Sequence, residues 1–206
     1  MRRDIFESTD PGLLDAIMRR ALIGELGIID VNGYPRIVPV NFVYTDGAVY
    51  FHGGPAGEKY SLMTANPKVT FMVYVAYSSI PSTLFSKNGS GCTASIWYRS
   101  AFIRGRGTIV EDIAEKSRAI QLLMEKDQPE GGYLDYTANI PFYELRVRGV
   151  TVFKVTPESI SIKDKFAQHK RPEDKRALIA FLEGRGLPID IETALIIREE
   201  LEGIQS

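Results

Sequence analysis

Residues 31–54, VNGYPRIVPVNFVYTDGAVYFHGG, indicate an antiparallel β fold. They contain two tight-turn pairs, Asn32-Gly33 and Asp46-Gly47, which alternate with runs of β-branched and aromatic residues. Such pairs between apolar runs are a strong short-range signal for a β-hairpin. Because residues 21–30 are also apolar, we predict a meander of three consecutive antiparallel strands over 21–30, 37–44 and 48–52.

The flanking sequence adds helices and further strands. Asp10 and Pro11 predict the start of a helix over residues 10–20, and Asn66-Pro67 ends a second helix that begins at Glu58. The other predicted elements are strands over 69–77, 94–110 (interrupted near Gly105 and Gly107) and 143–162, a loop over 78–92, and helices over 111–127, 172–183 (closed by Gly184) and 189–203. Five or six short antiparallel strands with inserted helices predict a small closed or half-closed barrel, mainly β within the α+β class.

Composition and length limit the classes of protein to consider. The chain has 206 residues and a formal net charge of −1, which argues against nucleic-acid binding through a large basic face. Cys92 is the only cysteine and the sequence has two histidines, so neither a disulfide nor a metal site is expected. The charged N-terminus resembles no signal peptide, and no run approaches the roughly 20 apolar residues of a membrane span. We expect a cytoplasmic protein that binds neither membrane nor nucleic acid.

Four ordered blocks resemble a known family. They are Val38 to Tyr44, Val49 to Lys59, Asn66 to Phe71, and Tyr98 to Gly107, and together they resemble the pyridoxamine phosphate oxidase-related proteins, most of all their nitroimidazole-resistance and flavin-nucleotide-binding branch. The resemblance covers roughly residues 13 to 160. Residues 163–170 are similar to a lysine–lysine–glutamine segment of some flavin-binding relatives, which commonly have asparagine in place of His169.

The resemblance implies a fold, a cofactor and a partner. It implies a six-stranded antiparallel split β-barrel that binds flavin mononucleotide (FMN), over residues 1–162, with a helical extension over 163–206 that packs on the barrel. Members of the family form homodimers with FMN at the subunit interface. The cofactor-binding residues that the matching blocks indicate are Pro39, Val40, Asn41, Phe42, Phe51, His52, Gly53, Lys59, Tyr98 and Ser100.

The segment from His52 to Lys59 suits a phosphate on physical grounds. A glycine-containing loop, residues 53–57, leads into a short helix whose first turn holds Lys59, so backbone N–H groups and one ammonium can meet one anion. The alternative is that the glycines only form a turn and Lys59 is solvated. A single histidine such as His52 is more often a surface or core residue than a catalytic one, but the resemblance places it beside the flavin.

Two further segments have open interpretations. Asn41 interrupts an apolar strand, so its amide either finds an internal hydrogen bond or meets the polar edge of the isoalloxazine ring, which Pro39, Val40 and Phe42 would also line. Pro39 predicts a strand edge or kink.

Tyr98 and Ser100 share one face of their strand. Ser100 can reach the phosphate or the ribityl chain, whereas Trp97 and Tyr98 can equally be core or dimer-interface aromatics. Arg104 and Arg106 either add charge to the anion site or are solvated. The mixed charges of residues 163–176 predict a solvated face, or else a cover for the flavin cleft or an anion site.

The sequence shows no nucleophile–base pair, so in an enzyme the flavin would carry the chemistry. We expect an FMN-dependent oxidoreductase that acts on a small molecule, such as a nitro compound, with NADH or NADPH as a candidate reductant. The arginine and histidine block that binds substrate in true pyridoxamine phosphate oxidases is absent near the C-terminus, which argues against that reaction. The alternatives are a non-catalytic flavin- or haem-binding sensor and, less favoured, a DNA-binding regulator.

Overall fold

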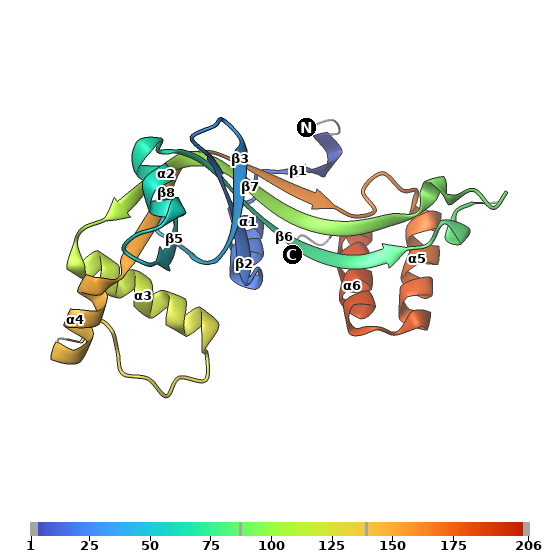
Figure 1. The fold of residues 1–206 in the computed structure, drawn as a ribbon. Coiled ribbons are helices and arrows are strands. Elements are labelled where there is room, and N and C mark those ends of the chain that lie inside the picture. Colours follow the sequence, from blue (N-terminus) through green and yellow to red (C-terminus); the bar gives the residue numbers. More distant parts are fainter. Residues whose placement is uncertain (1–3, 87, 139, 204–206) are drawn as a thin grey trace. The chain divides into compact units, whose positions relative to one another are not determined.

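The structure is a computed structural model, and it describes residues 4–86, 88–138 and 140–203. These residues form an eight-stranded, mainly antiparallel sheet, and helices occur between several of its strands along the chain (Figure 1). The chain divides into two compact units. One, the barrel unit, contains Asp10–Val73 and Ala101–Ser161; the other, the terminal unit, contains Tyr74–Ser100 with the two ends of the chain, residues 1–9 and 162–206. The predicted boundary between 162 and 163 remains a prediction.

The first strands of the barrel unit form the two predicted hairpins. Strands β2 (Ile23–Ile29) and β3 (Pro35–Asn41) pair antiparallel, as do β4 (Val43–Thr45) and β5 (Ala48–Gly53). The turns confirm the sequence signals, because Gly33 has φ +85° and Asp46 and Gly47 have φ +51° and +72°. The expected meander is nevertheless wrong. The strand order is β3-β2-β6-β7-β8-β5-β4, so the two hairpins lie at opposite ends of the sheet.

A single residue joins the two edges of this sheet. Phe42 separates β3 from β4, which are the first and last strands of the order, and it is fully buried with its ring edge-on to Phe71 at 5.1 Å. The sheet must therefore curl until its edges meet, and β3 also approaches β5. No strand ladder closes the edges among the described residues, so the architecture is the expected split barrel with eight strands rather than six.

Helices precede and follow the strands of the barrel unit. Helix α1 (Pro11–Arg20) begins as predicted, with the Asp10 carboxylate accepting a hydrogen bond from the Gly12 N–H at 2.8 Å. Helix α2 (Glu58–Ala65) follows β5, and α3 (Ile113–Asp127) follows β7. Helix α3 packs on the outer face of β5, where Ala119 meets Ala48 and Tyr50 in one buried cluster. Alternation along β5 therefore directs Val49 and Phe51, both fully buried, into the barrel.

The prediction of one strand over 143–162 is wrong. Residues Pro141–Gly149 form helix α4, and strand β8 runs from Thr151 to Lys165. Pro141 occupies the first helical position, and Tyr143 and Val147 are buried at the i, i+4 spacing of a helix. Val147 and Val150 suggested a strand because β-branched residues favour strands. Here tertiary packing of one helical face outweighed that preference.

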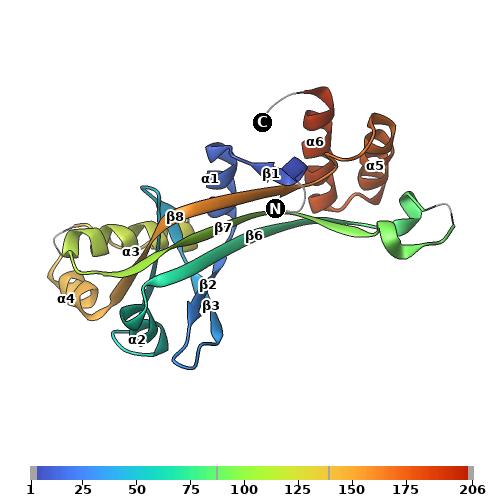
Figure 2. The same ribbon diagram turned by 90° about the horizontal axis from the view of Figure 1, so that it is seen from above.

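Two other long strands are β6 (Lys68–Ile80) and β7 (Ser95–Val110). Strand β7 lies between β6 and β8 (Figure 2), and all three strands belong to both units. The loop between β6 and β7 contains two short 3-10 turns, Ser82–Leu84 and Gly91–Thr93. Strand β7 is continuous, so the interruption expected near Gly105 and Gly107 is absent. The glycines instead admit close neighbours, since a Cβ on Gly105 would lie 2.3 Å from the Thr156 carbonyl oxygen.

The terminal unit combines the short strand β1 (Glu7–Ser8), which pairs with β8, with helices α5 (Pro172–Arg185) and α6 (Pro188–Glu202). The two helices pack on each other through buried residues such as Leu178, Leu182 and Ile197. Gly186, with φ +69°, ends α5, two residues after the predicted Gly184. Gly203, with φ +70°, ends α6.

Candidate functional site

The loop after β5 brings Lys59 back to the end of the strand. Gly57 has φ +120° and precedes α2, and the side chain of Lys59 lies over Gly53. A Cβ on Gly53 would lie 3.6 Å from Cε and 3.8 Å from Nζ of Lys59. Within the described part of the chain, Lys59 has no ion pair or hydrogen bond. Lys59 is half-buried, and its ammonium lies near the start of α2, as the phosphate hypothesis requires.

A second cation at this helix end escaped the sequence analysis. Arg36 of β3 donates through Nε to Glu58 Oε2 at 2.9 Å, and about half of each side chain is exposed. The signal was present in the alternation of β3, because Arg36 shares a face with Val38 and Val40, of which Val40 is buried. The start of α2 thus carries two cations and one carboxylate, which we call the α2 charge cluster: Arg36, Glu58 and Lys59.

His52 and Lys59 lie on opposite faces of β5. Successive side chains of a strand point to opposite faces, so His52 follows Ala48 and Tyr50 on the outer face, toward α3. Gly53, on which Lys59 lies, follows Phe51 on the inner face. The structure thus brings His52 and Lys59 to the same strand end, but one flat group cannot stack on both side chains at once.

The predicted residues on and next to β3 differ in how accessible they are to a ligand. Pro39 is exposed on β3, which is an edge strand as expected. Asn41 takes the first of its two alternatives, because its Nδ2 donates to Asp127 Oδ2 at 2.7 Å. Val40, Phe42 and Phe51 are buried in the core, so only their backbone atoms remain for a ligand.

Tyr98 and Ser100 belong to the terminal unit. The ring of Tyr98 is half-buried, and the ammonium groups of Lys163 and Lys165 lie 5.1 and 5.2 Å from its centroid. Ser100 is buried on the same face of β7. Trp97, on the other face, is a core residue with 2% exposure. This face of the terminal unit therefore presents one aromatic ring between two cations.

The remaining charged candidates have ordinary partners. Arg104 is exposed, and Arg106 forms a long, exposed ion pair with Glu158 at 3.9 Å. The segment 163–176 is not a wholly solvated face, because the buried Lys175 donates to Glu200 at 2.7 Å. Arg171 pairs with Asp174 on the exposed side.

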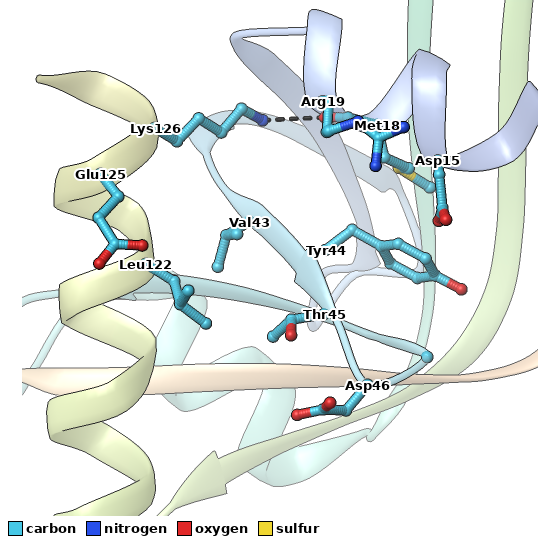
Figure 3. Close-up of a pocket in the computed structure, with 11 residues that line it drawn as sticks. Asp15, Met18, Arg19, Val43, Tyr44, Thr45, Asp46, Leu122, Glu125 and Lys126 are labelled. Atoms are coloured by element: carbon cyan, nitrogen blue, oxygen red, sulfur yellow. Dashed lines mark hydrogen bonds between the residues drawn. The ribbon is translucent and has the colours of Figure 1, made fainter. Parts of the chain in front are cut away.

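A cavity of about 750 Å³ in the barrel unit is lined by none of the predicted residues. Its lining comes from α1, α3 and the β4–β5 hairpin, and Figure 3 shows Lys126 reaching from α3 to the end of α1. The Lys126 ammonium donates to the carbonyl oxygens of Met18 and Phe42, at 3.0 Å each, and burial lowers its pKa to about 8. Because these hydrogen bonds engage Lys126 in stabilising the fold, we do not assign the flavin to this cavity.

A smaller cavity, about 210 Å³, lies on the other side of α3 and includes His52. Residues of a helix advance by about 100° each, so Leu122, Glu125 and Lys126 face the first cavity while Ile120, Leu123, Met124 and Asp127 face the second. One predicted residue, His52, lines this second cavity, and a second, Asn41, is hydrogen-bonded to its lining residue Asp127.

A family model described as pyridoxamine 5'-phosphate oxidase matches residues 10–164, which is most of the chain. The chain belongs to the pyridoxamine 5'-phosphate oxidase family. The match includes the whole barrel unit and the β7 segment with Tyr98 and Ser100, which agrees with the blocks recognised in the sequence. No curated protein matches the sequence.

Solved structures support the same assignment. The structure of a candidate 5-nitroimidazole antibiotic resistance protein from Bacteroides thetaiotaomicron is 25% identical, with a TM-score of 0.62, covering 76% of this chain and 85% of that one. The flavocytochrome Anf3 from Azotobacter vinelandii (16% identity, TM-score 0.62, 78% and 70% covered) shares the fold. So does the FAD and heme binding protein from Mycobacterium smegmatis (15% identity, TM-score 0.60, 83% and 79% covered).

None of the helices in the described segments has the length and apolar character needed to cross a membrane. No group of three or more histidine, cysteine, aspartate or glutamate side chains in these segments is arranged to hold a metal ion.

Proposed function

We propose that this member of the family binds FMN and is a flavin-dependent oxidoreductase that acts on a small molecule in the cytoplasm. The observation that carries the proposal is the α2 charge cluster, in which Arg36 pairs with Glu58, the first residue of α2, and the next residue, Lys59, lies over Gly53 at the end of β5. Two cations and the backbone N–H groups of a helix start are the groups that bind a phosphate monoester. The family match supports a flavin nucleotide as the molecule that carries this phosphate.

The split in the barrel suggests a path for the rest of the cofactor. From the α2 charge cluster, the flavin would pass across the gap between β3 and β5 to the outer face. There the exposed Pro39 and His52 and the half-buried Asn41 would border the isoalloxazine ring. This path accounts for the placement of Lys59 and His52 on opposite faces of β5. A bound flavin supplies transfer of hydride or electrons, with NADH or NADPH as the proposed reductant and a small nitro compound as one candidate substrate.

We further propose a homodimer with FMN at the interface. Tyr98 and Ser100 lie in the terminal unit, on a sheet face with the cations Lys163 and Lys165. In a symmetric dimer this face of one copy would cover the flavin held by the barrel unit of the other. A cationic face suits this position, because reduced flavins carry negative charge.

The absorption spectrum of the purified protein and a titration with FMN test the flavin proposal. We expect the spectrum of oxidised flavin in the purified protein, or uptake of added FMN. A protein that remains colourless in the presence of FMN would contradict the proposal, and a Soret band would favour the haem-binding alternative.

Variants of the α2 charge cluster should change FMN affinity in opposite directions. We expect Lys59→Ala to weaken FMN binding by about 1.5–3 kcal/mol, which is roughly 10- to 150-fold, because it removes a charged hydrogen bond to the phosphate. Glu58→Gln should tighten binding by about 0.2–1 kcal/mol, since it removes a like charge and frees Arg36. The matched control is Lys68→Ala, an exposed lysine at the start of β6, which should leave FMN affinity unchanged. Equal affinities for all three variants would remove the cluster from the site.

A further inference from the structure

The cavity beside His52 has the walls of a built pocket. Apolar and polar side chains line it together. The apolar residues are Ile120, Leu123, Met124, Val147 and Val150, and the polar ones are His52, Asp127, Tyr136 and Arg146. They come from α3, from α4, from the segment between these helices and from the end of β5, so four parts of the barrel unit converge on about 210 Å³.

One wall is an aromatic ring that is held in place before any ligand arrives. Tyr136 stacks on Tyr143 of α4, with ring centroids 4.0 Å apart and planes 19° from parallel. Its backbone N–H donates to Gln121 Oε1 of α3 at 3.0 Å. A fixed ring lowers the entropic cost of binding a flat molecule against it.

The cavity also has a cation with no acidic partner. Arg146 lies over the ring of Phe142, 5.3 Å from its centroid, and among the residues that the structure describes it pairs with no carboxylate. Its neighbour on α4, Arg148, is already paired with Glu144 at 2.8 Å. The carboxylate of the cavity, Asp127, receives the Asn41 amide. A guanidinium beside an apolar, partly enclosed space is a ready partner for a carboxylate.

The volume limits the size of a ligand. Water occupies about 30 Å³ per molecule in the liquid, so the cavity has room for about seven groups of that size. This is below the roughly 300–1,000 Å³ that a drug-sized ligand requires, so a flavin does not fit but a single aromatic ring with one substituent does.

We propose that this cavity binds single-ring aromatic carboxylates. The ring of the ligand would pack against Tyr136 and the apolar residues of the cavity, and its carboxylate would pair with Arg146. The location of the cavity next to His52 makes it the substrate side of the flavin site, and this assignment rests on the function proposed above. The binding itself does not depend on that function.

Calorimetric titration with benzoate tests the proposal, on the protein both with and without added FMN. We expect benzoate to bind, and benzyl alcohol and benzylamine to bind at least about tenfold more weakly, because only benzoate supplies a partner for Arg146. Tighter binding of benzylamine would assign the site to Asp127 and overturn the proposal, and so would failure of benzoate to bind.

Two variants and one control identify the cavity. Arg146→Met should weaken benzoate binding by about tenfold or more, whereas Arg148→Met, two residues further along α4 and outside the cavity, should leave it unchanged. Ile120→Phe should reduce binding by filling the space without a change of charge. Unchanged benzoate affinity in Arg146→Met would contradict the assignment.

A parallel FMN titration keeps the two proposals apart. If Arg146→Met retains the wild-type FMN affinity, the variant is folded and its loss of benzoate is local. If the wild type binds benzoate but no FMN, the flavin proposal fails and the cavity proposal stands.

Discussion

Lys126 is a cation that the barrel unit uses in its own construction. Its ammonium caps the last turn of α1 through the Met18 carbonyl oxygen and holds the Phe42 carbonyl oxygen at the joint between β3 and β4. It also lies 3.7 Å from the centroid of the Phe42 ring. Burial disfavours the charged form, which explains why the pKa falls to about 8.

The lowered pKa of Lys126 predicts a pH dependence of stability. Between about pH 8 and the ordinary value of 10.5, the unfolded chain retains the proton that the folded chain has lost, so this lysine makes the free energy of unfolding rise with pH. This contribution is fully present above 10.5 and is lost as the pH falls through 8. We expect the wild type to gain stability relative to Lys126→Met between pH 7 and pH 10, as measured by urea unfolding. A difference that stays constant with pH would contradict this, since other titrating groups are common to both proteins.

Asp190 plays the corresponding part in the terminal unit. It is fully buried and accepts hydrogen bonds from Arg185 Nε and from Ser78 Oγ, both at 2.6 Å. The Arg185 guanidinium, and then Ser78, hold the pKa of this carboxyl below its usual value of 3.8. Ser78 lies on β6 and Arg185 on α5, so one carboxylate ties α6 to both elements.

Replacement of Asp190 should therefore destabilise the terminal unit. We expect Asp190→Asn to lower the free energy of unfolding by about 3–5 kcal/mol at neutral pH, because it leaves the partner charge without its counterion. The wild type should lose this advantage as the pH falls below 3.8, because the unfolded chain then takes up a proton at Asp190 while the folded carboxylate, with its lowered pKa, still resists protonation. Urea unfolding at pH 7 and pH 3 measures both effects, with the exposed Glu202→Gln of the same helix as the control. Equal stability of the Asn variant and the wild type at pH 7 would contradict the prediction.

Single residues were predictable from sequence to different degrees. Lys59 was found because a glycine loop before a helix is a local pattern. The division of Lys59 and His52 between two faces of β5 follows from alternation, but which face points inward depends on packing with α3, which the local sequence does not state. Arg36 was missed because its partner Glu58 lies on another element.

At the scale of elements, β7 and β8 approach each other closely at Gly105. A Cβ there would lie 2.3 Å from the Thr156 carbonyl oxygen and 3.2 Å from Pro157 Cα, which are backbone atoms that cannot rotate away. We expect Gly105→Ala to destabilise the protein by about 1–3 kcal/mol, as measured by urea unfolding.

Gly149 at the end of α4 is the matched control for Gly105. A Cβ at this position meets no atom within 4 Å, so Gly149→Ala should be neutral or stabilising by up to about 1 kcal/mol. If both alanine variants had the same stability, the close approach of β8 would not explain why residue 105 is glycine.

Elements with local signals were predicted well. The tight turns, the Asp10 cap of α1 and the glycine at the end of α6 need only neighbouring residues, and the structure confirms them. Helix α4 was taken for a strand because its buried stripe is short and its flanks are rich in valine. The helix is stabilised by the packing of Tyr143 against Tyr136, and Tyr136 lies outside the helix, so the local pattern does not include it.

The order of the sheet is a property of the whole molecule and was not predictable from the chain. The turn signals identified two hairpins, but they contain no information on the partners of the outer strands. The family resemblance supplied the barrel, while the break at Phe42 and the division into two units became visible only in the structure.

Mixed dimers test the proposed arrangement of two copies. If each flavin site combines Lys59 of one copy with Tyr98 of the other, Lys59→Ala and Tyr98→Ala should each bind FMN weakly on their own. An equal mixture, refolded together, should regain tight binding at roughly one site in four, because half of the dimers are mixed and each has one intact site.

Light scattering first establishes whether the wild type is a dimer. A monomer, or a mixture that binds no better than its components, would exclude a shared site. Recovery of FMN binding after mixing without refolding would show in addition that the copies exchange.

Helix α3 is anchored at both of its ends. Near its start, Glu115 accepts hydrogen bonds from Tyr50 and Lys154, at 2.8 Å each; at its end, Lys126 and Asp127 hold the Phe42 carbonyl oxygen and the Asn41 amide. Each inserted residue would turn the far end by about 100° and exchange the residues that face the two cavities. During evolution, homologues should therefore vary in length after α3, in the segment that leads to α4, and keep the number of residues between its two anchors constant.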